Sequence, residues 1–290
     1  PLGLPGRDGV KPILFDPSTH PFRPIIETAG MDAFPFLFVS HGTPLTLIRD
    51  TPARRWLQAY GQQSPKPKAI LIMSAHWLSD GPIQVTGWSE HELLYDFYNF
   101  PDSFYEQRYP APGDPDLAGR IVQGLKNNGY EAELCLDRGL DHGSWVPLLF
   151  MFPQADIPVI QISLPYFMDD EELMALGNSL SYLADEGVLV LGSGLFTHSR
   201  KLRNRDDINA PLHPFAKEFM DWMTPVLESG VRDRLASAFG EAPRAIDMHP
   251  TDEHFRPLML VAGRGGPGRL QHRSLEYGAH VMDMWSFGGA

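Results

Sequence analysis

Short apolar runs recur along the chain and alternate with segments that have the period of a helix. Runs of four to eight apolar residues bounded by turn residues are typical of strands buried on both faces of a sheet. The runs predict strands over residues 35–40, 69–74, 82–87, 131–136, 157–163 and 187–192, with a last group near 270–286.

The clearest helical segment is 114–129, where Leu117, Ile121 and Leu125 recur on one face. Asp114 suits the N-cap, the following proline suits the first helical position, and Gly129 suits the end. Further helices are expected over residues 169–187, over 214–230 and from Pro257 onward.

This alternation of strands and helices predicts an α/β fold. We expect one sandwich domain over residues 34–290, with a largely parallel or mixed central sheet flanked by helices. Residues 1–33 are rich in Pro and Gly and are expected to form an extended N-terminal arm, with an expression vector as one possible source of part of it. Ligands of such sheets bind beyond the carboxyl ends of the strands, so the site is expected there.

Composition and charge exclude several classes of function. The 290 residues carry a formal net charge of -12, which argues against nucleic-acid binding, because phosphates require a basic surface. No apolar run approaches the roughly 20 residues of a membrane-spanning helix, and the N-terminal residues lack the continuous apolar region of a signal peptide. The single cysteine, Cys135, excludes an intrachain disulfide and is expected to be buried. A cytoplasmic monomer or homodimer is the expectation.

Three of the eleven histidines follow strand-like runs. His41 ends "FPFLFVSH", His76 ends "AILIMSAH" and His198 follows "GVLVLGSGLF" after one threonine. Neutral imidazole is available near pH 7, and ligands from separate strands build an open metal site of the catalytic type. The alternative is a set of loop histidines bonded to backbone. Surface or capping roles are expected for His20, His91, His272 and His280, and a structural role at a helix start for His213.

A set of motifs in a fixed order then suggests a family. The segments, in chain order, are "FVSHGTP", "MSAHW", "DFYNFP", "YPAPGDP", "DHGSWVPL", "PVIQISL" and "PTDEHFRPLML". Together they resemble the class III extradiol ring-cleaving dioxygenases, and within them the single-chain 4,5-DOPA extradiol dioxygenase branch. The resemblance covers roughly residues 35 to 288.

The resemblance implies a mononuclear Fe(II) site, with Zn(II) possible in isolated protein. His41 and His76 match two metal ligands. The third position falls at His254, beside Glu253, and the resemblance favours the histidine. Only one of the two can ligate, because consecutive side chains point in different directions.

The resemblance also implies roles for other residues. His198 matches the catalytic base and could act as a fourth ligand. His142 matches a histidine that touches the substrate or dioxygen, and Asp141 could fix its tautomer. Tyr98, in an aromatic segment, and His249 are further candidates for substrate contact, with packing as the alternative for both. Arg200 and Arg256 lie near the motifs, but surface roles are expected for them.

These observations predict an Fe(II)-dependent extradiol dioxygenase that opens a catechol with O2. L-DOPA, cleaved to 4,5-seco-DOPA, is the expected substrate. The partners are therefore a catecholic small molecule and O2. Two alternatives remain: a zinc-dependent hydrolase that uses the same histidines to activate water, and a non-catalytic relative that binds metal or a partner.

Overall fold

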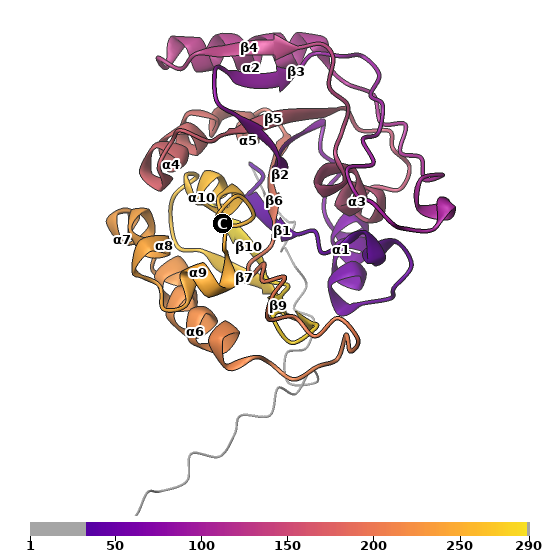
Figure 1. Ribbon diagram of the computed structural model, residues 1–290. Helices are drawn as coiled ribbons and strands as arrows, with labels where there is room; N and C mark the ends of the chain where they lie inside the picture. The colour runs from indigo at the N-terminus through magenta and orange to yellow at the C-terminus, as the bar shows by residue number, and fades with distance from the viewer. Residues whose placement is uncertain (1–32, 289–290) are drawn as a thin grey trace, which may run out of the picture.

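The structure is a computed structural model, and it describes residues 33–288. An eight-stranded mixed sheet lies at its centre, with the strand order β4-β3-β5-β2-β6-β1-β10-β7 (Figure 1). The strands are β1 (Phe36–Ser40), β2 (Ala69–Ser79), β3 (Ile83–Thr86), β4 (Ala132–Cys135), β5 (Val159–Pro165), β6 (Val188–Gly194), β7 (Arg269–His272) and β10 (Met284–Phe287). Two short strands, β8 (Leu275–Glu276) and β9 (His280–Val281), pair separately.

The middle of the sheet is parallel. Strand β2 pairs in parallel with β5 and β6, and β6 pairs in parallel with β1. Towards the edges, β3 is antiparallel to β5 and β10 is antiparallel to β1. The predicted mixed, largely parallel α/β sandwich is therefore confirmed. The predicted arm at residues 1–33, together with His20, lies outside the described residues except for Ala33.

Helices cover both faces of the sheet (Figure 1). Side chains of the buried strands alternate between two cores: Phe36, Phe38 and Leu71 face one, and Leu37 and Ile70 face the other. The helices are α1 (Pro52–Gln63), α2 (Pro115–Asn127), α3 (His142–Met151), α4 (Asp170–Ser179), α5 (Tyr182–Asp185), α6 (Pro214–Ser229), α7 (Arg232–Ala236), α8 (Ala238–Glu241), α9 (Ala245–Met248) and α10 (Pro257–Ala262), with 3-10 turns at Pro44–Leu47 and Asp102–Phe104. Helices α1 and α3 contribute to the second core, and most of the others to the first.

The predicted N-cap of α2 is confirmed, but one predicted helix is divided in two. The side chain of Asp114 accepts a hydrogen bond from the Leu117 amide at 2.9 Å, as an N-cap does. The helix expected over 169–187 instead divides into α4 and α5. Cys135 ends the edge strand β4 and is only partly buried, so its expected burial was wrong, because an edge strand has one open side.

Two glycines of β6 allow the chain to approach the sheet closely at one end. A Cβ at Gly194 would lie 2.0 Å from the carbonyl oxygen of His254, and one at Gly192 would lie 2.2 Å from that of Pro257. The Leu195 amide donates to the His254 carbonyl at 2.9 Å. Because no larger residue fits, the "GSG" of β6 serves to seat the segment of His254 against the carboxyl end of the sheet.

Strand β2 carries its histidine in an irregular stretch. The strand continues to Ser79, so His76 lies within it and not beyond its carboxyl end, as the apolar run suggested. The pairing of β2 with β5 shifts register between Met73 and Leu78. Such bulges re-aim side chains, and this one turns His76 toward the site.

Candidate metal centre and active site

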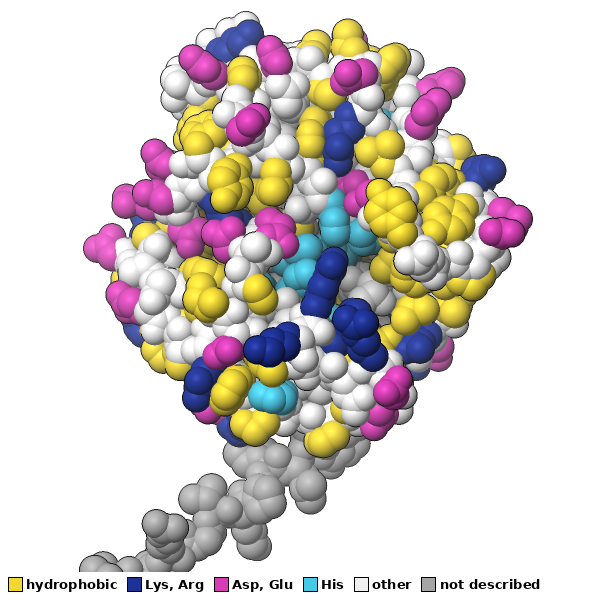
Figure 2. All heavy atoms as spheres, viewed as in Figure 1, with side chains coloured by type: hydrophobic (Ala, Val, Ile, Leu, Met, Phe, Trp, Pro, Cys, Tyr) yellow, Lys and Arg dark blue, Asp and Glu magenta, His cyan; other side chains and the backbone are white. Residues whose placement is uncertain are grey.

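Five histidine rings gather at one edge of the sheet, beyond the carboxyl ends of β1 and β6 and beside the irregular stretch of β2. The ring centroids of His41 and His76 are 5.1 Å apart, and that of His254 lies 5.5 Å from His41 and 5.0 Å from His76. The ring of His142 lies 4.1 Å from that of His76, and His198 stacks on His254 at 3.7 Å. The convergence predicted for strand-end histidines is thus observed, and Figure 2 shows histidine side chains at the bottom of a hollow in the surface.

A hydrogen bond orients the ring of His41, and a carboxylate contact orients that of His76. The Ser193 hydroxyl donates to the Gly143 carbonyl, so it accepts from Nδ1–H of His41 at 3.0 Å. Asp96 Oδ2 lies 3.4 Å from Nδ1 of His76, so the carboxylate favours the tautomer with its proton on Nδ1. In both rings Nε2 is therefore left with a lone pair that faces the site.

These two lone pairs fit a metal ion. Nε2 of His41 and Nε2 of His76 lie 3.3 Å apart. Two imidazole nitrogens bound to one metal at about 2.1 Å, with an angle between 90° and 109°, lie about 3.0–3.4 Å apart. Facing lone pairs repel each other unless a cation lies between them. Two groups of side chains offer ligand atoms that all lie within 4.8 Å of one another: His41, His76 and His142 form one, and His198, Glu253 and His254 form the other.

The contact between His254 and Glu253 bears on which of the two is the metal ligand. A carboxylate oxygen of Glu253 accepts a hydrogen bond from Nδ1 of His254 at 2.8 Å. The carboxylate thereby fixes the tautomer of His254 and leaves Nε2 free, as carboxylates beside metal-bound histidines do. This arrangement favours the histidine as ligand and gives the glutamate the supporting role.

Asp96 organises the site more than any other acid. Its Oδ1 accepts from both the backbone amide and Nδ1 of His142, each at 2.9 Å, while Oδ2 faces His76. Burial opposes ionisation of Asp96, but its bonds to His142 and the neighbouring His76 prevail and lower its pKa to about 2. Sequence reasoning missed this residue; the signal available was an acid inside the aromatic segment "LLYDFYNF".

Asp141 does not fix the tautomer of His142, so that expectation was wrong. Its carboxylate caps α3 by accepting from the Ser144 amide and also accepts from Ser74 and Gln161. The side chain is fully buried and is used by these bonds, while Nδ1 of His142 bonds to Asp96 instead.

Four histidines of the site, His41, His76, His198 and His254, are neutral at pH 7. Burial, reinforced by neighbouring imidazoles, lowers the pKa of His76 to about 4 and those of His41 and His254 well below their usual range. Burial and then the neighbouring His280 lower the pKa of His198 to about 3. Unprotonated rings are what metal binding and proton acceptance require.

The two further candidates for substrate contact, Tyr98 and His249, differ in their exposure to solvent. Tyr98 is 81% exposed, whereas the adjacent Phe97 is buried, with its ring centroid 5.6 Å from that of His142. Nε2–H of His249 donates to the Phe196 carbonyl at 3.0 Å, and the ring lies among those of Phe219, Phe239 and Phe255. This placement favours its packing alternative, and substrate contact by Tyr98 stays a prediction.

Some of the expected surface roles were wrong. His280 is 1% exposed and Arg256 is 4% exposed, with the Arg256 guanidinium bonded to the carbonyls of Tyr166 and Met168. His213 accepts from the Phe215 amide as the N-cap of α6, which confirms its structural role. His91 and His272 are partly buried and bonded to Val159 and Ser274.

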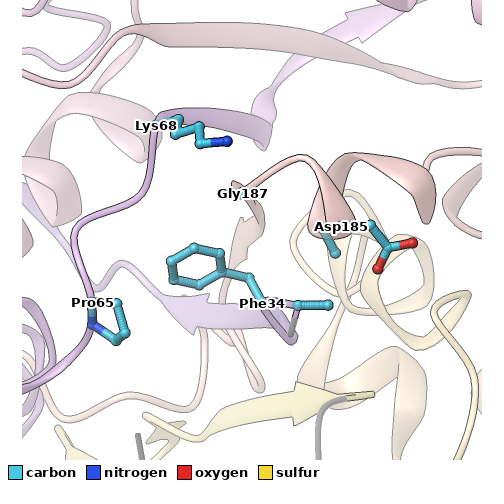
Figure 3. A pocket seen from close by; sticks show the side chains of 7 residues that line it. Phe34, Pro65, Lys68, Asp185 and Gly187 are labelled. Atoms are coloured by element: carbon cyan, nitrogen blue, oxygen red, sulfur yellow. The ribbon is translucent and has the colours of Figure 1, made fainter. Parts of the chain in front are cut away.

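A surface pocket at the opposite end of the sheet is separate from this site. Phe34, Lys68 and Gly187 line it and lie just before β1, β2 and β6, at their amino ends (Figure 3). No histidine lines it, so the candidate chemistry belongs to the carboxyl end.

We expect Asp96→Asn to weaken metal binding by about 10- to 100-fold, the usual effect of losing a carboxylate that supports a metal ligand. The amide keeps the shape of the side chain but cannot accept from both His142 and His76. Competition against a chelator measures the change. Asp50→Asn, which removes an exposed carboxylate paired with Arg55, is the matched control. Equal chelator midpoints for Asp96→Asn and wild type would refute the role of Asp96.

Comparisons with known proteins agree with this site. The model of a family described as the catalytic LigB subunit of aromatic ring-opening dioxygenase matches residues 35–282. A Beta vulgaris protein named 4,5-DOPA dioxygenase extradiol is 39% identical over 257 residues, covering 86% of this chain and 95% of its own. An Escherichia coli K12 protein of the same name is 34% identical over 239 residues, covering 79% and 84%.

A solved structure supports the same relationship. The crystal structure of an uncharacterised Escherichia coli K12 protein superposes with a TM-score of 0.74 at 30% identity, covering 88% of this chain and 99% of that one. No helix among residues 33–288 is long and apolar enough to cross a membrane. With a family match over most of its length and the histidine cluster at the sheet edge, this chain belongs to the LigB family of class III extradiol dioxygenases, enzymes that open aromatic rings.

Proposed function

We propose that the enzyme is Fe(II)-dependent and cleaves L-DOPA between ring carbons 4 and 5 to give 4,5-seco-DOPA. The observation that carries the proposal is the pair of Nε2 lone pairs of His41 and His76, 3.3 Å apart beneath a surface hollow. The substrate follows from the names of the relatives from Beta vulgaris and Escherichia coli, which are 4,5-DOPA dioxygenases.

His41, His76 and His254 hold the metal in this proposal. Iron(II), when bound, would hold the catechol and O2 together and would let electrons pass from the catecholate to O2. The three imidazoles are neutral, so they leave the charge of the ion uncompensated and favour binding of an anionic catecholate. Ser193, Asp96 and Glu253 each hold one ligand ring by its Nδ1, which fixes the direction of Nε2 before the metal arrives.

His198 accepts the proton of a catechol hydroxyl. Its ring stacks on His254, which places it beside the metal position, and it is partly exposed to the hollow. Its pKa of about 3 in the free protein keeps it unprotonated, and the negative charge of the catecholate beside it raises that pKa on binding. The proton can then be returned to the product.

His142 lies beside His76, on the side of the site away from His198, and can form a hydrogen bond with the substrate. Asp96 accepts a hydrogen bond from its Nδ1–H, which leaves Nε2 free to contact the substrate. Phe97 packs its ring edge on to His142 and gives the wall an apolar surface against which an aromatic ring can lie.

Oxygen uptake tests this function. Metal-free protein is reconstituted with Fe(II) without air, L-DOPA is added, and O2 is then admitted. We expect uptake of one O2 for each L-DOPA consumed, with a yellow product, because extradiol cleavage incorporates both oxygen atoms into one ring-opened molecule. Dissolved oxygen and the visible spectrum are recorded together.

The same protein loaded with Zn(II) is the control, since zinc has no redox chemistry and cannot support the reaction. Uptake that is equal with either metal would contradict the iron requirement. Absence of uptake with Fe(II) and a panel of simple catechols, together with hydrolysis of an ester or amide by the Zn(II) form, would favour the hydrolase alternative.

A further inference from the structure

A group of basic side chains borders the histidine site. The loop after His198 carries Arg200, Lys201, Arg203 and Arg205, and none of them lies within 4.0 Å of an acidic group among the described residues. Figure 2 shows Lys and Arg side chains directly beside the histidines of the hollow. In a chain of net charge -12, unpaired cations at this position make a local positive field that favours an anion.

The loop is held against the segment that carries His280. The Asn204 amide donates to the Tyr277 carbonyl at 2.8 Å, and the Tyr277 amide donates to the Ile208 carbonyl at 2.9 Å. The Val281 amide donates to the Thr197 hydroxyl at 2.7 Å. These bonds bring the ring of His280 to 6.0 Å from that of His198, so His198, the basic loop and His280 meet at one place.

Buried polar atoms at this place lack partners. Both ring nitrogens of His280, which is 1% exposed, and Nε of Arg203 make no hydrogen bond to any described residue. Leaving buried polar groups unpaired is costly, so such groups mark a missing partner. Arginine only donates, and a neutral imidazole can donate one N–H, so the partner that suits both is an oxygen acceptor. Burial, followed by the charges of Arg203, His249 and Arg200, lowers the pKa of His280 to about 3 and keeps it neutral.

We propose, on the basis of the proposed function, that Arg200, Arg203 and His280 form a subsite beside His198 that binds the carboxylate of the substrate side chain. Guanidinium groups match the planar carboxylate and bind it more strongly than neutral donors do. In an amino acid attached to a catechol, three bonds of about 1.5 Å separate the ring from the carboxylate carbon, a reach of about 4 Å. This reach fits a catechol at His198 whose side chain points toward His280.

Arg200→Met and Arg203→Met test the subsite with two catechols. L-DOPA carries the carboxylate, and dopamine has the same ring and amine without it. We expect KM for L-DOPA to rise about 10- to 100-fold in either variant, the usual effect of removing a hydrogen bond to a charged group. KM for dopamine should stay unchanged or fall. Lys201→Met is the matched control, because it removes one charge from the same loop outside the proposed subsite.

Two results in this comparison would overturn the subsite. One is an equal rise in KM for L-DOPA and dopamine, which would indicate general disturbance of the site. The other is no change for L-DOPA in either variant, or a change as large in Lys201→Met.

A binding measurement separates this inference from the proposed function. Calorimetry on the anaerobic Fe(II) protein compares 3-(3,4-dihydroxyphenyl)propionate with 4-propylcatechol, which differ in the carboxylate. We expect wild type to prefer the carboxylate and Arg203→Met to lose that preference. If the preference is found but neither L-DOPA nor dopamine is cleaved, only the proposed function fails. If a catechol is cleaved without the preference, only the subsite fails.

Discussion

We expect the His198→Ala variant to keep its metal and to lose about 10²- to 10⁴-fold in kcat, the usual contribution of a positioned acid–base group. The methyl group of alanine cannot accept the catechol proton, while Nε2 of His41 and His76 still face the metal position. Oxygen uptake under saturating L-DOPA measures kcat, and metal analysis of the same sample measures occupancy. The substitution removes a ring that is only partly buried, so the fold should be retained.

The two readouts separate the roles that the sequence left open for His198. Retained turnover within about tenfold of wild type would remove it as the base, because that is below the effect of a positioned proton acceptor. Loss of metal together with turnover would instead make it a fourth ligand. Thermal unfolding of the metal-free variant serves as the control for folding.

The His76→Ala variant should lose both metal and turnover. Its ring provides one of the two facing Nε2 atoms, and its removal also leaves Asp96 without one of its partners. Loss of a residue that merely supports a ligand weakens metal binding by about 10- to 100-fold, so loss of the ligand itself should weaken it by more than about 100-fold. Chelator competition gives the affinity, and oxygen uptake gives the activity.

The matched control for this variant is His91→Ala. His91 is also a partly buried histidine, but its ring bonds to the Val159 carbonyl away from the site. We expect it to bind metal and consume O2 as wild type does. Full metal occupancy in His76→Ala would exclude His76 as a ligand, and equal metal loss in both variants would point to general unfolding.

The strands were predictable because each forms a short apolar run, but parts of the helical layers were not. Helix α3 is buried along nearly its whole length and contains Pro147, so it shows no polar face and no helical period. The helix expected over 169–187 breaks after Ser179, where tertiary packing overrides a continuous apolar stripe. The end of β2 was missed because Ser74 and His76 interrupt its apolar run although the strand continues.

The site was predictable where it depends on strand ends and not where it depends on side-chain directions. His41 and His198 follow β1 and β6, and parallel strands bring their carboxyl ends to one edge. Asp96 lies in an irregular segment, and no period or spacing links it to His142. The burial of His280 likewise depends on how the loop after His198 packs on β9, which requires the three-dimensional structure.

The strand order has a consequence for how the enzyme is made. Strand β1 lies between β6 and β10, with Leu37 paired to Leu191 and Phe36 to Phe287. During synthesis β1 is made before both of these neighbours, and its apolar side chains stay unpaired until β6 and β10 have emerged. The histidine cluster also assembles late, because His254 is made long after His41. Pairings so distant in sequence form slowly and leave hydrophobic strands exposed, so nascent chains of this enzyme should depend on chaperones.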